Sequence, residues 1–424
     1  MWRALTQRWM RWWFEPTTPD NLGLCRLIIV GILFLYYLPL DATGWARVPS
    51  VFRMPIPAFR LLHLEVLPAN ALAVLQVIWK VALLLTAVGL WTRASATVSA
   101  ALGLYLLGLP NNFGKTHHFD GMVVIALTIF AVARCADAWS LDALRRADPA
   151  RPGERLRSGE YTWPIRAMWA SMSLIFFAAG VAKLRYSGLS WITSNNMAIL
   201  LVQAQYHIAN ADPAVRWGLA IATSPWICRM IAAATMVFET GYPLALFIPA
   251  ARWIIVPGMA GLLIGIRLLM GPTFWPFVIC QLFWVPWDRV AAWLRARLPA
   301  GKRVAVVFDG ACGLCQRTIA VLRRLDVLGR VEWLDAVHQW REVAARFPQL
   351  DQGACLADMH GVSADGAITR GFDTYRMLAW VLPLGWVLLP MLYLPGVRPI
   401  GRRVYGAIAG QRLRQGCSIA RSPS

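Results

Sequence analysis

The chain has 424 residues, of which 58% are hydrophobic and only 15% are charged. Soluble domains carry about 25% charged residues, so this composition excludes a chain that is soluble throughout. Lys and Arg number 42 against 22 Asp and Glu, which gives a formal net charge of +20. A surplus of this size is typical either of a nucleic-acid-binding protein or of a membrane protein with basic loops.

The N-terminal residues predict a helix that lies in a membrane interface. The opening segment, MWRALTQRWMRWWFEP, lacks the apolar core of a cleavable signal peptide. Trp2, Leu5, Trp9 and Trp13 are spaced to share one face of a helix, and arginines flank that face. We therefore expect residues 1–20 to form an amphipathic interfacial helix.

Long apolar runs follow, and each could cross a bilayer. A membrane-spanning helix needs about 17 to 25 mostly apolar residues. Residues 21–290 are therefore expected to form an all-α polytopic membrane bundle of about eight spans. The runs are Leu22–Leu40, Ala71–Trp91, Ala94–Leu109, Gly121–Ala138, Ala167–Leu184, Met230–Phe247, Trp253–Met270 and Thr273–Trp287.

The basic residues predict an orientation for this bundle. If both termini lie inside, the inner side receives about twice as many Lys and Arg as the outer side. Because positive charge is retained on the cytoplasmic side, we expect a multi-pass protein of a bacterial inner membrane with cytoplasmic N and C termini. The basic residues flank the spans without a recognition motif, so the expected partner is the lipid bilayer and not nucleic acid.

Beyond a basic linker at residues 291–302, the composition changes to that of a soluble α/β domain at residues 303–424. The run VAVVF at 304–308 predicts a buried strand, and Asp309-Gly310 predicts a turn. The sequence Cys312-Gly-Leu-Cys315 then opens a helix with Ile319 on its apolar face. Strand, tight turn, C-x-x-C and helix, in that order, form the layout of a thioredoxin-like active site.

The position of the two cysteines predicts redox chemistry. A thiolate at a helix N-terminus is stabilised by the macrodipole and the unpaired amides, which favours Cys312 as the attacking thiol. Cys315, one turn later, would resolve a mixed disulfide. A zinc half-site and unreactive packing remain alternatives, because further candidate ligands are present although scattered. Those ligands are His338, Cys355, His360 and Cys417.

The remainder of the domain suggests further elements. The apolar stretch before the last helix contains three prolines, so it could dock the domain on the membrane or belong to a buried core. The expected elements are a strand at Val331–Leu334, a helix at Ala336–Arg346, a hairpin of Cys355–Val362 with Ala367–Thr369, the apolar stretch Met377–Gly396 and a basic helix at Arg398–Arg414.

Three segments of this domain resemble a known family. VVFDGACGLC, DMHGVSADGAITRGFD and LYLPGVRPIGRRVYGAIA are similar to the DCC family of thiol-disulfide oxidoreductases, over nearly all of residues 303–417. The resemblance implies a thioredoxin-like fold and redox-active cysteines at Cys312 and Cys315.

Several ionisable residues fall in or beside the predicted spans. Lys80 and Glu239 lie near the middles of their runs, where an unpaired charge is costly, so we expect them to pair with each other or with water. Lys183 lies at a span end, either as a base in an apolar cavity or as a snorkelling lysine. A metal site of His117 and His118 with other outer residues is a further alternative, but no helical pair of ligands supports it and we assign no metal.

The membrane region carries a second resemblance. THHFDGM, AWSLDAL, FFAAGVAKL and VFETGYP are similar to the horizontally transferred transmembrane (HTTM) domain, which is related to the membrane region of vitamin K-dependent gamma-carboxylases, over roughly residues 15–290. The resemblance implies chemistry on reduced vitamin K at the matching residues His118 and Lys183. Ala182 and Thr116-His117 depart from the carboxylase pattern, and its large lumenal domain has no counterpart.

The leading hypothesis is an integral membrane thiol-disulfide oxidoreductase with a cytoplasmic C-x-x-C domain. Its membrane domain would bind a quinone, a vitamin K-like isoprenoid lipid or a peptide or protein thiol substrate, and we assign His117, Glu239 and Lys80 to cofactor binding. One alternative is a carboxylase-like or epoxidase-like enzyme with Lys183 as base. A second alternative is a non-catalytic membrane scaffold or peptide-maturation partner.

Overall fold

The computed structural model describes most of the chain, and the described residues form two compact units. Unit 1 contains the described residues up to Asp142 and those of 157–287, and unit 2 contains residues 143–146 and the described residues from Asp288 onward. The described residues are 2–114, 120–146, 157–205, 217–297, 304–326, 329–382, 385 and 389–414.

Unit 1 is helical in its described residues, and four of its helical stretches are long and apolar enough to cross a membrane. They coincide with four of the eight predicted spans. The stretches are Asp20–Tyr37, which comprises α2 (Asp20–Cys25), a π-helical turn (Arg26–Val30) and α3 (Gly31–Tyr37); α5 (Ala69–Val88); Gly159–Ser187, which contains α9 (Trp163–Ser187); and α15 (Pro249–Met270).

The other four predicted spans form shorter helices. At 1.5 Å per residue, the 12 residues of α7 extend only about 18 Å, which is less than the hydrocarbon thickness of a bilayer. Pro243 follows the end of α13, and Pro286 follows the 3₁₀ turn after α16, so prolines interrupt two of the runs. The total of about eight spans stays a prediction. The shorter helices are α6 (Thr92–Gly108), α7 (Gly121–Val132), α13 (Pro225–Gly241) and α16 (Trp275–Cys280).

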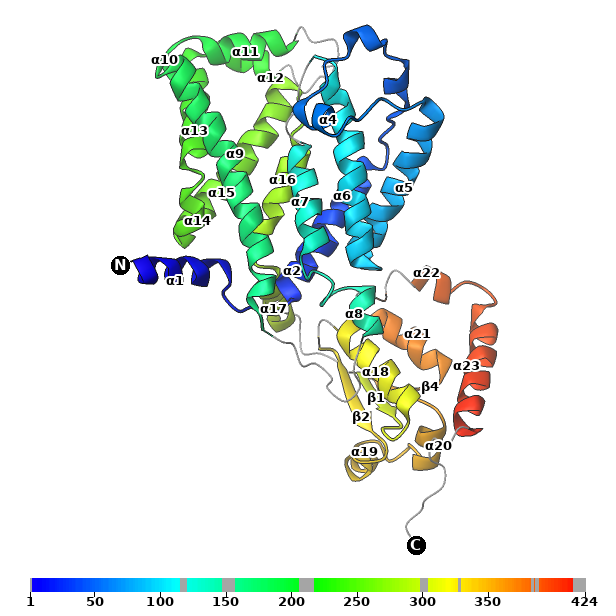
Figure 1. The fold of residues 1–424 in the computed structure, drawn as a ribbon. Helices are drawn as coiled ribbons and strands as arrows, with labels where there is room; N and C mark the ends of the chain where they lie inside the picture. Colours follow the sequence, from blue (N-terminus) through cyan, green and yellow to red (C-terminus); the bar gives the residue numbers. More distant parts are fainter. Residues whose placement is uncertain are drawn as a thin grey trace. The chain divides into compact units, whose positions relative to one another are not determined.

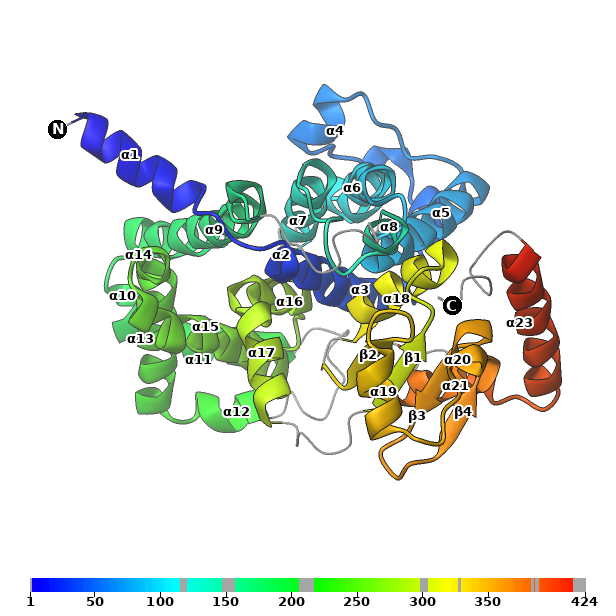
Figure 2. The same ribbon diagram turned by 90° about the horizontal axis from the view of Figure 1, so that it is seen from below.

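Helices α5, α6 and α7 pack side by side, and α9 packs against α7 and α13 (Figures 1 and 2). The predicted N-terminal amphipathic helix is present as α1 (Trp2–Trp13). The smaller helices of unit 1 are α4 (Pro57–Leu61), α10 (Ser190–Thr193), α11 (Asn196–Gln205), α12 (Trp217–Ala222) and α14 (Leu244–Phe247), and α8 (Leu141–Arg145) spans the boundary between the units.

Unit 2 is built on a four-stranded sheet with the order β2-β1-β3-β4. Strand β1 pairs in parallel with β2 and antiparallel with β3, and β3 forms an antiparallel hairpin with β4. The elements are α17 (Trp287–Arg297), β1 (Val304–Phe308), α18 (Gly313–Leu325), β2 (Val331–Asp335), α19 (Trp340–Arg346), α20 (Gln352–Ala357), β3 (His360–Val362), β4 (Ile368–Arg370), α21 (Phe372–Val381), α22 (Leu389–Leu392) and α23 (Val397–Arg414).

The central strand β1 is buried on both faces, as its continuous apolar sequence predicts. Val304, Val306 and Phe308 pack on one face with Ile319 of α18 and Leu378 of α21. The opposite face carries Ala305 and Val307, which pack with residues of α19 and α20. The sheet therefore lies between two helical layers, and α18, which begins with the cysteine pair, belongs to one of them.

Two local predictions in unit 2 are wrong. Cys355 does not begin a hairpin strand, because it lies in α20; the Asp351 side chain accepts a hydrogen bond from the amide of Ala354 at 2.8 Å and caps that helix. The predicted helix at Ala336 begins only at Trp340, since the Asp335 carboxylate binds the amide of Val337 at 2.8 Å and holds the chain in a turn.

Candidate active site

The cysteine pair lies where the buried strand β1 passes through a tight turn into α18. Cys312 is the residue directly before the helix, and its carbonyl accepts the helical hydrogen bond from the amide of Gln316 at 2.9 Å. Cys315 lies in the first helical turn. The predicted sequence of strand, turn, C-x-x-C and helix is therefore present in the structure.

The turn before the cysteines is held by two aspartates. The buried carboxylate of Asp309 accepts a hydrogen bond from the amide of Ala311 at 3.0 Å. Gly310 approaches Asp335 so closely that a Cβ atom at this position would lie 1.8 Å from an oxygen of that carboxylate. Only glycine fits there, and this close approach fixes the path of the chain into Cys312.

Asp335 also organises the polar side of the turn. Its carboxylate lies 2.7 Å from Nδ1 of His338 and accepts hydrogen bonds from the amides of Val337 and His338. Burial acts to raise the pKa of Asp335, but these hydrogen bonds outweigh burial and hold the pKa below its ordinary value. Asp335, His338 and Arg323 line a cavity of about 300 Å³ together with Gly310 and Gln316.

The two cysteines differ in exposure. Cys312 is fully buried, whereas Cys315 is partly exposed and forms part of the wall of a second, larger cavity. The assignment of Cys312 as attacking thiol and Cys315 as resolving thiol stays a prediction. The position of Cys315 nevertheless gives this sulfur the more direct access to a ligand in that cavity.

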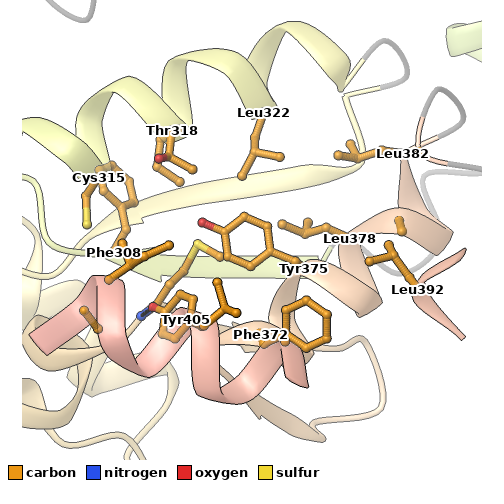
Figure 3. A pocket seen from close by; sticks show the side chains of 18 of the residues that line it. Phe308, Cys315, Thr318, Leu322, Phe372, Tyr375, Leu378, Leu382, Leu392 and Tyr405 are labelled. Atoms are coloured by element: carbon orange, nitrogen blue, oxygen red, sulfur yellow. Dashed lines mark hydrogen bonds between the residues drawn. The ribbon is translucent and has the colours of Figure 1, made fainter. Parts of the chain in front are cut away.

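The larger cavity is an apolar groove of about 650 Å³, which we call the Cys315 groove. In Figure 3, Cys315, Thr318 and Leu322 of α18 lie along one side, and Phe372 and Tyr405 lie along the other. Within the described part of the chain, its lining contains no Asp, Glu, Lys, Arg or His. The groove is therefore suited to an apolar ligand.

Helix α23 forms one wall of the groove and is attached to α21 by ion pairs. Asp373 accepts a hydrogen bond from Nε of Arg398 at 3.0 Å and another from Nε of Arg402 at 3.0 Å. Burial raises the pKa of Asp373, but the two guanidinium groups outweigh this effect and hold the pKa below its ordinary value. Gly401 faces the Phe372 ring, where a Cβ atom would lie 2.3 Å from a ring carbon.

Cys355 lies apart from this site. It is buried in α20, and burial raises the pKa of its thiol to about 11, so the thiolate is scarce near neutral pH. The other predicted candidate, Cys417, lies outside the described residues. Among the residues that the structure describes, no group of three His, Cys, Asp or Glu side chains is arranged to hold a metal ion.

Lys80 and Glu239 do not pair with each other, which was one of the two predicted alternatives. Glu239 of α13 binds Lys183 of α9, with Nζ at 2.7 and 2.6 Å from the two carboxylate oxygens. The helices approach closely because α9 has Gly180 at their contact, where a Cβ atom would lie 2.7 Å from Thr240. Lys80 instead donates a hydrogen bond to the carbonyl of Leu40 at 2.8 Å.

The structure therefore brings only some of the predicted membrane residues together. Lys183 and Glu239 form a pair, and the side chain of Lys183 lies over the ring of Trp191 at 5.4 Å. His117 and His118, which were predicted to take part in catalysis and cofactor binding, lie outside the described residues. Their relation to Lys183 stays a prediction.

The apolar wall on α23 was missed by the sequence analysis. Ile400, Val404 and Ile408 all line the groove and are 61%, 54% and 48% exposed. Their spacing of four residues in a basic helix was the available signal, because it places them on one face.

Comparisons with known proteins match part of the chain. An uncharacterised chloroplastic protein of Arabidopsis thaliana is 26% identical over 121 residues, which cover 27% of this chain and 54% of that protein. The chain thus spans about half the length of the curated relative that it matches. No solved structure matches the chain. Residues 306–418, which include the cysteine pair, the sheet and the groove, match the family of DCC1-like thiol-disulfide oxidoreductases.

Proposed function

We propose that this chain is a membrane-anchored thiol-disulfide oxidoreductase whose Cys312 and Cys315 alternate between a dithiol and a disulfide. The observation that carries the proposal is the C-x-x-C sequence at the start of α18, directly after a buried strand, within the segment that matches the oxidoreductase family. The parallel β1-α18-β2 unit that holds the pair supports a thioredoxin-like arrangement. Four long apolar helices support membrane anchoring.

The chemistry balances as an exchange of two electrons. One cysteine thiolate attacks a substrate disulfide, forms a mixed disulfide and releases the first substrate thiolate, which takes up a proton from solvent. The second cysteine then attacks the sulfur of the first and releases the second substrate thiol. The enzyme is oxidised to a disulfide, and the substrate disulfide is reduced to two thiols; the reverse sequence oxidises a substrate dithiol.

Helix α18 can promote this exchange through its N-terminus. The first amides of a helix have no partners within the helix, and the macrodipole places partial positive charge at that end. These groups stabilise a thiolate relative to a thiol, so they favour both the attacking and the leaving form of the cysteines. The apolar groove beside Cys315 acts in the opposite direction, because apolar surroundings disfavour a thiolate, so the helix N-terminus has to offset this cost.

The arrangement in unit 1 does not favour the alternative in which Lys183 acts as a base. Both carboxylate oxygens of Glu239 contact Nζ of Lys183, so the Lys183 side chain forms one half of an ion pair between α9 and α13. Binding of a quinone or another isoprenoid lipid by unit 1 stays a prediction, as does the cytoplasmic location of both termini.

Single serine variants of the full chain test the proposed function. With dithiothreitol as electron donor and a protein disulfide as substrate, we expect Cys312→Ser and Cys315→Ser each to reduce turnover to the uncatalysed rate. The matched control is Cys355→Ser, which removes a buried thiol outside the site and should retain turnover. Retained turnover in the Cys312→Ser/Cys315→Ser double variant would contradict the proposal.

The same variants distinguish the roles of the two cysteines. The variant that retains the attacking thiol accumulates a mixed disulfide with substrate, because no second thiol can resolve it. Mass spectrometry of the trapped species therefore identifies the attacker. Alkylation of the pair by a membrane-impermeant reagent, in intact and in permeabilised cells, tests the proposed cytoplasmic location.

A further inference from the structure

The Cys315 groove places a sulfur in the wall of an apolar cavity, and this juxtaposition indicates the substrate class. Its volume of about 650 Å³ lies within the range of small-molecule sites. Three aliphatic side chains of α23, Ile400, Val404 and Ile408, face it while about half or more exposed. Exposed apolar surface of this kind, in a concave site, is typical of a ligand-binding groove.

Two hydroxyl groups of the groove already form hydrogen bonds within the protein. The hydroxyl of Thr318 donates to the carbonyl of Leu314 at 2.9 Å, and the hydroxyl of Tyr405 accepts from the amide of Met359 at 3.1 Å. An extended peptide in this groove would lose hydrogen bonds to water without gaining equivalent ones, which is costly. A linear aliphatic chain has no such requirement.

We propose that the groove accepts the aliphatic chain of a lipid-tailed disulfide and directs its sulfur to Cys315, an inference that rests on the proposed oxidoreductase function. The Cys315 thiolate attacks the tailed sulfur, forms a mixed disulfide with it and releases the other half of the substrate as a thiolate that takes up a proton. Cys312 then attacks Cys315, releases the tailed thiol and closes the enzyme disulfide. In this proposal Cys315 is the attacking thiol and Cys312 the resolving one, which reverses the roles predicted from the sequence.

The two cysteines reach the groove differently, and this difference supports the assignment. The fully buried Cys312 does not line the groove, whereas Cys315 does. A chain held along α18 and α23 would end beside Cys315, as the view of the groove in Figure 3 shows. Four membrane-length helices would keep the enzyme where lipid-tailed molecules are concentrated.

Alkylation rates test the groove without requiring turnover. In the full chain carrying Cys312→Ser, Cys315 is treated with N-ethylmaleimide and with N-dodecylmaleimide, and peptide mass spectrometry follows each site. An Ala364→Cys substitution, in the exposed turn between β3 and β4, supplies a reference thiol in the same molecule. We expect the labelling rate of Cys315, divided by that of the reference thiol, to rise at least about tenfold with the longer chain, because only Cys315 offers a groove for the added methylenes.

Two glutamate substitutions on α23, one inside the groove and one outside it, form a matched pair of variants. Val404→Glu should remove the chain-length preference, whereas Ala407→Glu, on the same helix but outside the groove lining, should preserve both the preference and the N-ethylmaleimide rate. A rate ratio that does not change with chain length, or a preference that survives Val404→Glu, would overturn the proposal. So would protection of Cys315 by an apolar helical peptide but not by dodecanol, which would identify the occupant as a protein segment.

Turnover separates this inference from the function on which it rests. If disulfide exchange occurs but the preference for dodecyl over ethyl disulfides is absent from KM, the oxidoreductase function stands and the lipid-tailed substrate is wrong. If alkylation shows the chain preference but no disulfide is reduced, the proposed function fails and the groove alone survives. Trapping of the tailed thiol on Cys312 in the Cys315→Ser variant would refute the assignment of Cys315 as attacker.

Discussion

The two units of the molecule use apolar surface in opposite ways. Along α5 of unit 1, Val74, Val77 and Val81 are each at least 50% exposed on the outside of a 20-residue helix. In unit 2 every residue of β1 is buried, and exposed aliphatic side chains line a concave groove beside a cysteine. The same apolar surplus thus supplies an exposed apolar surface on a helix of membrane-spanning length in one unit and a ligand-sized cavity in the other.

Charged groups follow the reverse pattern. Unit 1 buries Arg26 completely, and it pairs Lys183 with Glu239 between two helices. In unit 2 the two arginines of α23 that pair with Asp373 are largely exposed to solvent. Charges within helices of membrane-spanning length must be satisfied inside the helical bundle, because lipid would offer no hydrogen bonds in their place.

Arg26 gives the strongest test of this contrast. Its guanidinium donates to the carbonyls of Thr86, Ala87 and Cys135 at 2.6, 2.8 and 3.1 Å, and also to that of Trp139. Arg26→Met would remove the side-chain donor from four carbonyls, of which that of Thr86 keeps the amide of Gly89 as a donor; at about 1–3 kcal/mol for each carbonyl left without a donor, we expect a total loss above about 4 kcal/mol. Thermal unfolding in detergent, followed by size-exclusion chromatography, measures this loss. Arg93→Met, at an exposed helical position, is the control and should change stability little.

Variants of the Lys183–Glu239 pair should lose less stability than Arg26→Met, and the double variant should recover part of the loss. Lys183→Met or Glu239→Leu alone leaves one partly buried charge unpaired, and we expect each to cost about 3 kcal/mol. The double variant removes both charges and should be more stable than either single variant. A double-mutant cycle of unfolding measurements determines the coupling. Additive losses would show that the two side chains do not depend on each other.

The strand, turn and helix around Cys312 could be predicted because each depends on neighbours in the sequence. The run VAVVF, the Asp309-Gly310 turn and the cysteine spacing all lie within twelve residues. Helix α20 was not predicted, because the residues after Asp351 were interpreted as a strand. In the structure the Asp351 side chain caps a helix there instead. The span count rested on hydropathy alone, which does not register that α13 ends just before Pro243 or that α16 changes to a 3₁₀ turn after Cys280.

The groove and the ion pair could not be predicted, because they join distant parts of the chain. Phe308, Leu378 and Val404 come from a strand and two helices that are far apart in the sequence. Lys183 and Glu239 are 56 residues apart in the sequence. Hydropathy showed that both lie in or beside apolar runs, but it did not show whether Lys80 or Lys183 binds Glu239. Long-range packing decides these contacts, whereas composition and periodicity report only local preference.

Two glycines of α23 differ in their surroundings, so replacing each of them tests how closely this helix packs against the rest of unit 2. Gly401→Ala would place a methyl group against the Phe372 ring, so we expect a loss of about 2 kcal/mol and a displaced groove wall. Gly406→Ala, on the same helix, meets nothing within 4 Å and should be neutral or stabilising by up to about 1 kcal/mol. Denaturant unfolding measures both variants, and N-dodecylmaleimide labelling of Cys315 reports the wall. Equal stability of the two variants would contradict close packing at Gly401.

The smallest expected effect comes from the surface charges that attach α23. Because the pKa of Asp373 is lowered in the folded state, its contribution is fully present above the pKa of an unfolded aspartate, near 4, and is lost as pH falls through the folded pKa. The paired arginines are largely exposed, so we expect Asp373→Asn to cost only about 1 kcal/mol at neutral pH. Unfolding measured between neutral and acidic pH should show the difference between wild type and variant shrinking as Asp373 is protonated. A difference that persists at the acidic end would assign the effect to packing instead of charge, and addition of salt at neutral pH, which screens only the ionic contribution, provides the independent check.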